Sequence, residues 1–336
     1  MHIGTVDLSQ DVLVIAEIGN NHEGDFGRAA DMIHAAAAAG VQVVKFQTII
    51  PERLVSADQT ARIAQLGRYA FSRDQFTELA GIARAAGVMF MSTPFALEAV
   101  SWLDELVPAF KIASGDNNFQ QLLAAVAATG KPILLSTGMA DLAGIKKSCR
   151  IIESAGLSGK TCSEIALLHC VSAYPTPAEE ANLSAIATLA RETGRVVGYS
   201  DHTLGIAAAA LSIGVGARIV EKHFTLSKTQ SEFRDHALSA DPSELAALVK
   251  QIRLAQKLLG TGEKTPRPSE AATTAAARRS IVARTALPAG HVLTDADMDW
   301  LRPGGGLQPG QEPLLIGRRI ACAVKQGQMI LPEMVA

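Results

Sequence analysis

Residues 12–46 read VLVIAEIGNNHEGDFGRAADMIHAAAAAGVQVVKF, and this stretch decides the fold class. An apolar run at residues 12–16 is followed by a helical segment at 28–39, then by Gly40 and a second apolar run at 41–46. Runs that are apolar at nearly every position are typical of parallel strands, because helices bury both faces of a parallel sheet. A glycine directly after a helical segment is typical of a helix end. The stretch therefore predicts a strand, a helix and a second, parallel strand.

The same alternation continues along the first 260 residues. Eight apolar runs predict strands at 12–16, 41–46, 88–91, 109–112, 132–135, 165–168, 196–199 and 218–220, and the segments between them predict helices that include 28–39, 74–86, 120–128, 145–155, 183–192 and 242–259. Eight strand–helix units in ~250 residues predict an α/β fold of the (β/α)8 or TIM-barrel type. The alternative is a doubly wound open sheet, which usually has fewer units and a GxGxxG loop after its first strand. Residues 17–22, EIGNNH, lack that spacing.

The composition of the chain changes after residue 260. Residues 260–268, GTGEKTPRP, are rich in glycine and proline and predict the end of the last helix. We therefore expect a TIM-barrel catalytic domain at 1–260, a linker at 261–277 that includes a short helix, and a small β-rich domain at 278–336. A module of about 60 residues is small for a self-sufficient core, so we expect it to lean on the barrel or on a second subunit.

Composition and charge exclude several classes of function. Of the 336 residues, 48% are hydrophobic and 19% are charged, which is ample for a packed core, and the net charge is -2. Without a basic face, we expect no nucleic-acid partner and no membrane partner. The cysteines Cys149, Cys162, Cys170 and Cys322 form no CxxC pair, and the amino-terminal sequence does not have the pattern of a signal peptide. These features predict reduced thiols and a cytoplasmic protein.

Polar side chains lie at the ends of all eight predicted strands, where the reactive groups of a (β/α)8 barrel lie. They are Glu17; Lys45 and Gln47; Ser92 and Thr93; Lys111 and Ser114; Ser136 and Thr137; His169, Ser172 and Tyr174; Ser200, Asp201 and His202; and Glu221, Lys222 and His223. Lys45 and Lys111, among serine and threonine hydroxyls, suit a small phosphorylated anion. A lysine that forms a Schiff base, as in aldolase barrels, is the alternative. His22, in the polar loop after the first run, is a further candidate contact for a substrate.

Two histidines predict a metal site. His202 and His223 end adjacent predicted strands, which lie about 4.8 Å apart, so their imidazoles could share one divalent ion. We expect Asp201 and Glu221 to bond the far ring nitrogens or to attract the cation. Two protein ligands leave positions for water and substrate, which favours a catalytic ion. Ligation by nitrogen and oxygen without thiolate favours Mn²⁺ or Mg²⁺ over zinc.

Eight ordered motifs resemble those of the sialic acid synthase family, which includes the N-acetylneuraminate, legionaminate and pseudaminate synthases. The matching strings are IAEIGNNHEG (15–24), VKFQT (44–48), STPF (92–95), KIASGD (111–116), LSTGM (135–139), LLHCVSAYPTP (167–177), GYSDHT (198–203) and EKHFT (221–225). The segment RRSIVARTALPAGHVLTDADMDWLRPGGG (278–306) resembles the antifreeze-like (SAF) domain that closes these enzymes. The resemblance covers essentially the whole chain.

The resemblance implies a reaction and a set of site residues. The family condenses phosphoenolpyruvate with N-acetylmannosamine or a related 2-acetamido sugar and water, and forms a nine-carbon nonulosonic acid and phosphate. By resemblance, phosphoenolpyruvate would be held by Lys45, Thr93, Lys111, Ser114, Ser136 and Ser200; the metal by His202 and His223; and the sugar by Glu17, Gln47, Tyr174 and Asp235. Glu17, His202 and His223 are the candidate catalytic residues, with Glu17 positioning or activating a reacting hydroxyl or water. The family also implies a domain-swapped homodimer, in which Arg302 reaches into the partner's site.

Several positions depart from the family pattern. Asp116 stands where glutamate is commoner, and Ser172 stands where the N-acetylneuraminate enzymes often have asparagine. Residues 231–236, SEFRDH, replace a PGPDH-like string and are one residue longer, and residues 56–72 also differ. The departure at 231–236 indicates a different sugar, and the segment 56–72 lies where another sugar contact would be expected.

Two other functions stay open at this point. A related barrel could condense phosphoenolpyruvate with a phosphorylated aldose, as in deoxy-octulosonate or deoxy-heptulosonate phosphate synthesis. Such a site needs a second phosphate pocket with several arginines, and arginines are few near the predicted strand ends. The antifreeze-like segment suggests a non-catalytic saccharide-binding or ice-binding protein. Ice binding requires a flat face rich in threonine, whereas residues 278–336 contain only Thr285 and Thr294.

Overall fold

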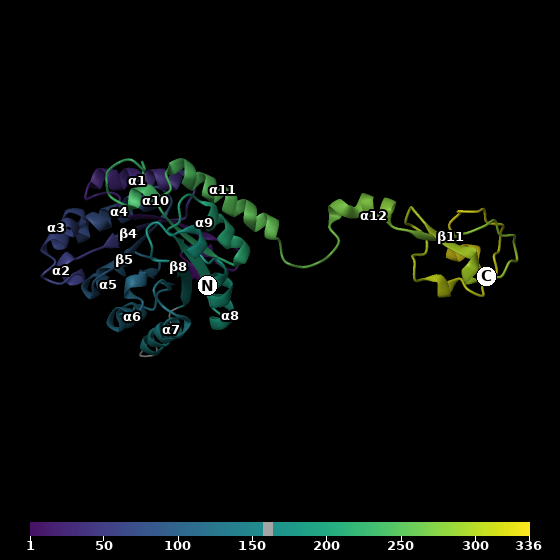
Figure 1. Ribbon diagram of the computed structural model, residues 1–336, viewed down its shortest axis with the longest axis horizontal. Helices are drawn as coiled ribbons and strands as arrows, with labels where there is room; N and C mark the ends of the chain where they lie inside the picture. Colours follow the sequence, from purple (N-terminus) through teal and green to yellow (C-terminus); the bar gives the residue numbers. More distant parts are fainter. Residues whose placement is uncertain (157–163) are drawn as a thin grey trace. The chain divides into compact units, whose positions relative to one another are not determined.

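The computed structural model describes residues 1–156 and 164–336, which form two compact units, Met1–Gly260 and Thr261–Ala336 (Figure 1). Three of the four cysteines are described, and all three are free; Cys149 and Cys170 are buried, whereas Cys322 is exposed. Cys162 lies outside the described residues. Among the residues that are described, no helix combines the length and the apolar character that crossing a bilayer requires.

The first unit contains one parallel sheet of eight strands, which confirms the predicted barrel. The strands are β3 (Leu13–Gly19), β4 (Val43–Thr48), β5 (Met89–Pro94), β6 (Phe110–Ile112), β7 (Ile133–Ser136), β8 (Ile165–Cys170), β9 (Val196–Asp201) and β10 (Ile219–His223). Their order is β5-β4-β3-β10-β9-β8-β7-β6, and β5 also lies against β6, so the sheet is nearly closed. The first strand of the barrel pairs with the last, which excludes the open doubly wound sheet.

Several strands run further than the apolar runs predicted. The last predicted run, 218–220, continues to His223, and the run at 165–168 continues to Cys170. Polar side chains end these strands, and hydropathy alone does not recognise them as strand residues. Their backbones nevertheless continue the ladder, which sets Glu17 opposite both Lys45 and His223 in the register.

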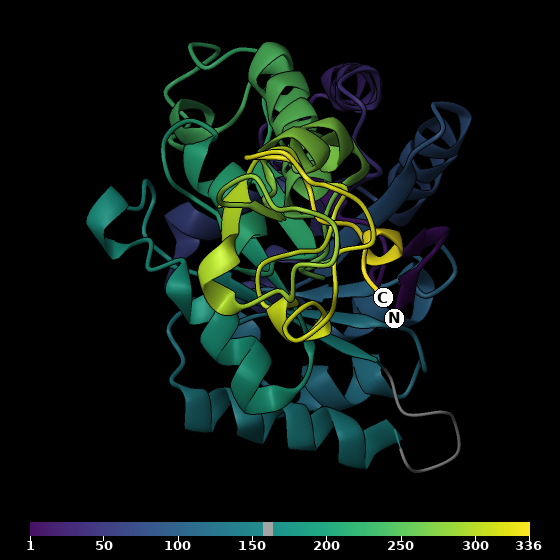
Figure 2. The ribbon, with the colours of Figure 1, turned by 90° about the vertical axis from the view of Figure 1, so that its right-hand side faces the viewer.

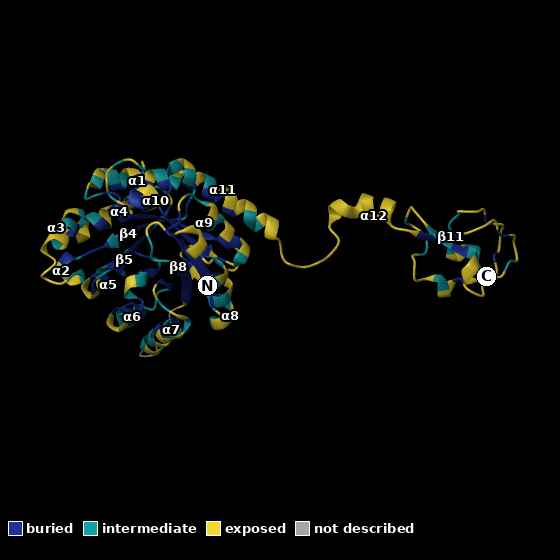
Figure 3. Cartoon of the chain, in the orientation of Figure 1, coloured by how far each residue is buried: buried dark blue, intermediate teal, exposed yellow. Residues whose placement is uncertain are grey.

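Helices cover the outside of the barrel (Figure 1, Figure 2). They are α1 (Phe26–Ala38), α2 (Pro51–Leu54), α3 (Thr60–Tyr69), α4 (Arg73–Ala85), α5 (Leu97–Leu103), α6 (Gln120–Ala127), α7 (Leu142–Gly156), α8 (Ser184–Thr193), α9 (Ala207–Ser212), α10 (Asp235–Leu238) and α11 (Pro242–Leu259), with 3-10 turns η1 (Ser114–Asp116), η2 (Ala178–Glu180) and η3 (Ile213–Val215). Capping boxes start α4 at Ser72 and α11 at Asp241, and Gly40 follows α1 with a φ of 89°. The apolar faces of the helices pack against the strands in the main core, so the strands are buried on both faces (Figure 3).

A small hairpin closes the amino-terminal end of the barrel. Strands β1 (His2–Ile3) and β2 (Val6–Asp7) pair in antiparallel fashion, and their side chains Ile3 and Val6 join a second core with the inward-facing side chains of the strands, such as Ile15. This packing fills the amino-terminal half of the interior. The polar strand ends at the carboxyl side are therefore left to form the site.

The second unit has a small core of its own. It contains η4 (Pro268–Glu270), α12 (Ala271–Ala277), β11 (Ser280–Ala283), η5 (Asp295–Asp297), β12 (Met298–Leu301), η6 (Glu312–Leu314) and η7 (Pro332–Met334). Strands β11 and β12 form an antiparallel pair, and isolated bridges such as Leu287 with Val324 continue the β structure. Ile281, Met298 and Ile330 are among the buried residues of its core.

Candidate active site

A cavity at the carboxyl end of the barrel gathers most of the predicted site residues. Its lining includes Glu17, Lys45, Gln47, Thr93, Lys111, Ser114, Ser136, Tyr174, Ser200, His202 and His223, together with Phe95, Ala113, Cys170 and Glu221. These residues come from all eight strands or from the residues that directly follow them. The barrel thus brings together side chains that lie more than 200 positions apart in the sequence, and we call this space the inner cavity.

The Lys45 ammonium group is buried among oxygen atoms. Its Nζ lies 2.6 Å from Glu17 Oε2, 3.6 Å from Glu221 Oε2, and donates a 3.0 Å hydrogen bond to Thr93 Oγ1. Burial alone would lower the pKa of Lys45, but the two carboxylates raise it above its ordinary value. Lys45 is therefore held as a cation, which favours an ionic role over that of a Schiff-base amine.

Lys111 faces the same cavity from β6. Its Nζ donates a 2.6 Å hydrogen bond to Ser136 Oγ and lies 3.7 Å from Glu221 Oε1. Burial lowers the pKa of Lys111 in spite of the nearby Glu221 carboxylate. The two lysines thus differ electrostatically, although both point to one space.

Glu221 connects the two lysines, a role that the sequence did not indicate. Each of its carboxylate oxygens faces one ammonium group, and Ser200 Oγ donates a 2.8 Å hydrogen bond to Oε1. Burial would raise the pKa of Glu221, but Lys111 and Lys45 lower it to about 2. Glu221 therefore stays negatively charged and lies between the Lys45 and Lys111 ammonium groups.

His202 and His223 lie side by side at the mouth of this cavity. Their ring centroids are 5.3 Å apart, and the Tyr174 ring covers His202 with a centroid distance of 4.1 Å. His202 Nδ1 donates a proton to the Val171 carbonyl oxygen at 2.9 Å. Burial would lower the pKa of His202, but Cys170 and the Val171 carbonyl raise it above its ordinary value. His223 Nδ1 is buried and has no hydrogen-bond partner among the described residues. Burial, and then His202, lower the pKa of His223 well below its ordinary value, which keeps it neutral.

The prediction that Asp201 supports one of these imidazoles is wrong. Asp201 Oδ2 lies 2.9 Å from Lys222 Nζ, and both side chains are fully buried away from the cavity lining. Asp201 and Lys222 alternate with the cavity residues Ser200 and Glu221 along their strands, so they face the opposite side of the sheet. The prediction that Glu221 bonds a far ring nitrogen is also wrong, since Glu221 contacts the lysines and Ser200.

A larger outer pocket of about 960 Å³ lies over these strand ends, and a volume of this size suits a small-molecule ligand. The predicted sugar contacts Gln47, Tyr174 and Asp235 all line it. Residues that the sequence did not single out complete the wall, and they include Glu23, Arg62, Gln65, Tyr69, Phe233 and Arg234. Except for Glu23, the signal for them was the departure of residues 56–72 and 231–236 from the family pattern.

Three predicted candidates lie elsewhere. His22 is buried and stacks on Phe71 at 4.3 Å, and burial lowers its pKa to about 4, so it is a neutral packed histidine and does not line the outer pocket. His169 Nε2 lies 2.9 Å from the Ala181 carbonyl oxygen, which agrees with a structural role. Arg302 is an exposed residue of the second unit, and its role stays a prediction.

The fold and the cavity define a (β/α)8-barrel protein with a site for a small anionic ligand at the carboxyl ends of its strands. Residues 32–264 match the NeuB family, and residues 278–336 match the SAF domain. The chain belongs to the NeuB family.

Known proteins are similar over nearly the whole chain. An uncharacterized protein of Methanocaldococcus jannaschii is 43% identical over 94% of this chain and 92% of its own length. The N,N'-diacetyllegionaminic acid synthase of Legionella pneumophila is 35% identical over 97% of this chain and 95% of its own. The solved N-acetylneuraminic acid synthetase of Leptospira borgpetersenii, in complex with citrate, has a TM-score of 0.76 and 34% identity over 81% of this chain and 94% of its own.

Proposed function

We propose that this protein is a C–C bond-forming transferase that condenses phosphoenolpyruvate with a 2-acetamido sugar and water to give a sialic-acid-type nonulosonic acid and phosphate. One observation carries the proposal: two buried lysines and several hydroxyls enclose an inner cavity that adjoins a larger polar pocket. A small enol ester fits the first space and a sugar fits the second. The similarity to a legionaminic acid synthase over nearly the whole chain supports the same reaction.

The inner cavity is the proposed site of phosphoenolpyruvate. Lys45 and Lys111 supply positive charge, and the hydroxyls of Thr93 and Ser136 accept hydrogen bonds from them, which leaves the hydroxyl protons free for a substrate. Ser200, which donates to Glu221, supplies a third hydroxyl. Ser114 is the sixth residue proposed to hold this substrate. Because these groups are buried, their attraction for a phosphate is stronger than it would be in water.

His202 and His223 are the residues that would hold a divalent ion, which we propose is Mn²⁺ or Mg²⁺. His202 is held through Nδ1, so its other ring nitrogen could ligate an ion once that nitrogen is deprotonated, and His223 presents an unpartnered buried nitrogen; both suit imidazole ligands. Within residues 1–156 and 164–336, no set of three or more His, Cys, Asp or Glu side chains is placed to hold an ion, which agrees with a site that leaves positions for water and substrate. When bound, the ion would polarise the aldehyde oxygen of the sugar as a Lewis acid.

The proposed reaction makes one carbon–carbon bond and one carbon–oxygen bond, and breaks the carbon–oxygen bond to phosphate. C3 of the enol phosphate attacks the aldehyde carbon of the sugar, which leaves an alkoxide on the sugar and positive charge at C2. Water then adds to C2 and loses one proton to Glu17, which passes a proton to the alkoxide to give the hydroxyl group. The new C2 hydroxyl loses its remaining proton to the departing phosphate as the C2–O bond to phosphate breaks, which leaves a ketone. Burial raises the pKa of Glu17, which suits a carboxylate that accepts a proton, and the two lysines neutralise the departing phosphate.

The sugar is proposed to lie in the outer pocket against Gln47, Tyr174 and Asp235. Gln47 Nε2 donates a 2.9 Å hydrogen bond to Glu17 Oε1, so the proposed sugar contact and the proposed base are directly linked. A domain-swapped homodimer, in which Arg302 reaches the partner's pocket, is part of the proposal. The carboxylates of Glu232 and Asp235 at that pocket suit a visiting guanidinium. We also propose a cytoplasmic location, because the described cysteines are free thiols.

A panel of acceptors tests the proposed function. Phosphate release from phosphoenolpyruvate and the product mass are measured with 2-acetamido and 2,4-diacetamido hexoses, the 6-phosphate of N-acetylmannosamine, and phosphorylated aldoses without an amide. The phosphorylated acceptors are included because Arg62 and Arg234 line the outer pocket. The proposal expects phosphate release only with an amino sugar. Turnover only with a phosphorylated aldose would favour the deoxy-octulosonate type of reaction, and no turnover with any acceptor would contradict the proposal.

A further inference from the structure

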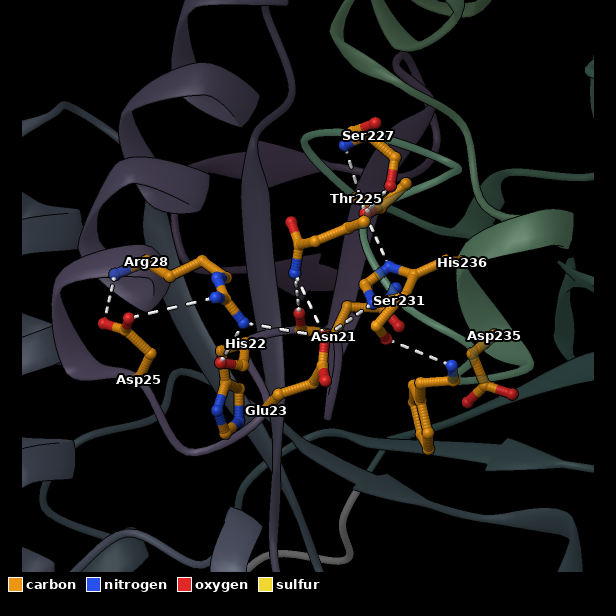
Figure 4. A network of polar contacts seen from close by, with 12 residues as sticks. Asn21, His22, Glu23, Asp25, Arg28, Thr225, Ser227, Ser231, Asp235 and His236 are labelled. Atoms are coloured by element: carbon orange, nitrogen blue, oxygen red, sulfur yellow. Dashed lines mark hydrogen bonds and ion pairs between the residues drawn. The ribbon is translucent and has the colours of Figure 1, made fainter.

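The loop at residues 224–234, which carries residues of the outer pocket, is held by a second loop at residues 20–25. Residues 224–234 follow β10 and bring Phe233 and Arg234 to the outer pocket, with Asp235 at the start of α10. Residues 20–25 follow β3, and the polar side chains of the two loops meet there (Figure 4). Because β3 and β10 are neighbours in the barrel, these loops lie beside each other.

His236 uses both of its ring nitrogens at this junction. It is fully buried, Nδ1 lies 2.7 Å from Thr225 Oγ1, and Nε2 lies 3.0 Å from Glu23 Oε1. The Thr225 hydroxyl, which also lies 3.1 Å from the Ser227 carbonyl oxygen, holds the Nδ1 side of the ring. A carboxylate only accepts, so Nε2 donates to Glu23. The His236–Glu23 contact is thus a charge-assisted hydrogen bond.

Glu23 gathers several donors on one oxygen atom. Besides His236, Gln230 Nε2 donates to Oε1 at 3.2 Å, and Arg28 Nη1 lies 3.5 Å from it. The backbone of Glu23 has a φ of 50°, in the left-handed region that residues other than glycine rarely adopt. Such a conformation is kept only when the surroundings determine it, and it concentrates at functional sites. The contacts of the Glu23 side chain are therefore those of a fixed anchor.

Asn21 holds both ends of the segment that runs from residue 224 to residue 239. Its Nδ2 donates to the Phe224 carbonyl at 2.8 Å and to Ser239 Oγ at 2.9 Å. Ser239 Oγ in turn donates to the Asp235 carbonyl at 2.6 Å. With its ends held by Asn21 and its middle held through Gln230 and His236, the segment has little freedom to move Asp235.

We propose that Glu23 and His236 are positioning residues that hold Arg234 and Asp235 in place for the amino sugar. Arg234 links the two sides of the pocket, since its guanidinium lies 4.9 Å from the Tyr174 ring centroid and its Nε donates to Asp235 Oδ1 at 3.1 Å. The inference rests on the proposed function, because it assigns these contacts to the sugar half of that site. The inner cavity does not include Glu23 or His236, so phosphoenolpyruvate binding should not depend on them.

Substitution of Glu23 tests the inference, since Glu23 is less buried than His236 and its loss is easier for the fold to tolerate. For Glu23→Ala we expect the KM for the amino sugar to rise about tenfold or more, as is typical when a charge-assisted hydrogen bond is lost. The kcat and the KM for phosphoenolpyruvate should change by less than about twofold. Glu23→Gln, which keeps an acceptor without charge, should show a smaller effect in the same direction. Glu52→Ala, at an exposed glutamate of α2, is the matched control and should match the wild type.

A double variant separates a shared contact from independent damage. If Glu23 and His236 act through one bond, Glu23→Ala combined with His236→Gln should raise the sugar KM no more than the larger single effect. Hydrogen exchange of peptides that cover residues 226–236 gives a second readout that needs no turnover, and exchange there should be faster in Glu23→Ala than in the wild type. An active wild type together with an unchanged sugar KM and unchanged exchange in Glu23→Ala would overturn the inference. An inactive wild type would instead contradict the proposed function, and the exchange result would still decide the positioning role.

Discussion

The Nζ atom of Lys45 lies 2.6 Å from Oε2 of Glu17, and both side chains are almost completely buried. Burial raises the pKa of Glu17, while the nearby Glu17 and Glu221 carboxylates raise the pKa of Lys45. The pair therefore places a group that can exchange a proton beside a group that stays positively charged. A reaction between water and an enol phosphate needs both groups: one that accepts the proton of the water and one that neutralises the phosphate.

Glu17→Gln should leave the fold intact and lower kcat by about 100-fold or more, the usual loss when a general base is removed. The amide keeps a polar group that can bond Gln47, so the KM for phosphoenolpyruvate should change little. Steady-state kinetics with both substrates check this, with Glu52→Gln as the exposed control. A kcat within about tenfold of the wild type would remove Glu17 from the chemistry.

Lys111→Met should weaken phosphoenolpyruvate binding by about ten- to 100-fold, because one buried ammonium that would meet the anion is lost. Thermal stability should not fall greatly, since burial already disfavours the charged form of Lys111. Calorimetric titration with phosphoenolpyruvate and a melting curve measure the two effects. Treatment of the wild type with borohydride in the presence of pyruvate should give no covalent adduct, and an adduct on Lys111 would favour the Schiff-base alternative instead.

His223→Ala should retain the fold but lose tight binding of Mn²⁺, because one of the two proposed imidazole ligands is removed. Titration followed by electron paramagnetic resonance measures binding without any need for turnover, and circular dichroism checks the fold. His34→Ala, at an exposed histidine of α1, serves as the control. A folded His223→Ala protein that binds Mn²⁺ as tightly as the wild type, or that retains full turnover, would refute the metal assignment.

The second unit should lose stability in acid, because protonation of Asp297 removes the contribution of its carboxylate. Hydrogen bonds from His291 and Thr294 lower its pKa from 3.8 to about 2, so its contribution is present above about pH 4 and is lost as the pH falls toward 2. Trp102→Phe leaves Trp300 of β12 as the fluorescent reporter of this unit. Urea midpoints at pH 6 and pH 3 should differ less in Asp297→Asn than in its parent, and an equal difference would contradict the assignment.

Truncation after Gly260 should raise the KM for the amino sugar more than the KM for phosphoenolpyruvate, because Arg302 is the only proposed site residue that is removed. The shortened chain keeps every residue of the inner cavity. Kinetics and sedimentation of both forms measure affinity and oligomeric state together. An unchanged sugar KM in the truncated protein would count against the swapped dimer.

The barrel was predictable from the sequence because its buried parallel strands are apolar at nearly every position before their carboxyl ends, as at β7 and β8. The inner cavity was also predictable, since polar residues in the later part of such a strand or directly after it lie toward the carboxyl end of the barrel. Lys45, Lys111, His202 and His223 are examples, and all four line one cavity. Which face a residue takes was harder to predict: Asp201 and Glu221 were treated alike, yet they end on opposite sides of the sheet.

The outer pocket could not be built from the sequence in the same way. Much of its wall comes from α3 and from residues 231–235, which belong to segments that connect the barrel strands and whose positions over the barrel no strand pattern fixes. Tyr69 and Phe233 meet there with ring centroids 5.5 Å apart, although 164 positions separate them in the printed sequence. The Glu23–His236 bond likewise joins two loops whose proximity depends on the closure of the barrel.

The most direct test of the proposed reaction is the origin of the oxygen in the released phosphate. The wild-type protein is incubated in H₂¹⁸O with phosphoenolpyruvate and the best amino sugar of the panel, and phosphate and product are weighed by mass spectrometry. We predict unlabelled phosphate, formed in equal amount with a nonulosonic acid, because water adds to carbon and not to phosphorus. Labelled phosphate, or phosphate released equally fast without the sugar, would contradict the proposed reaction.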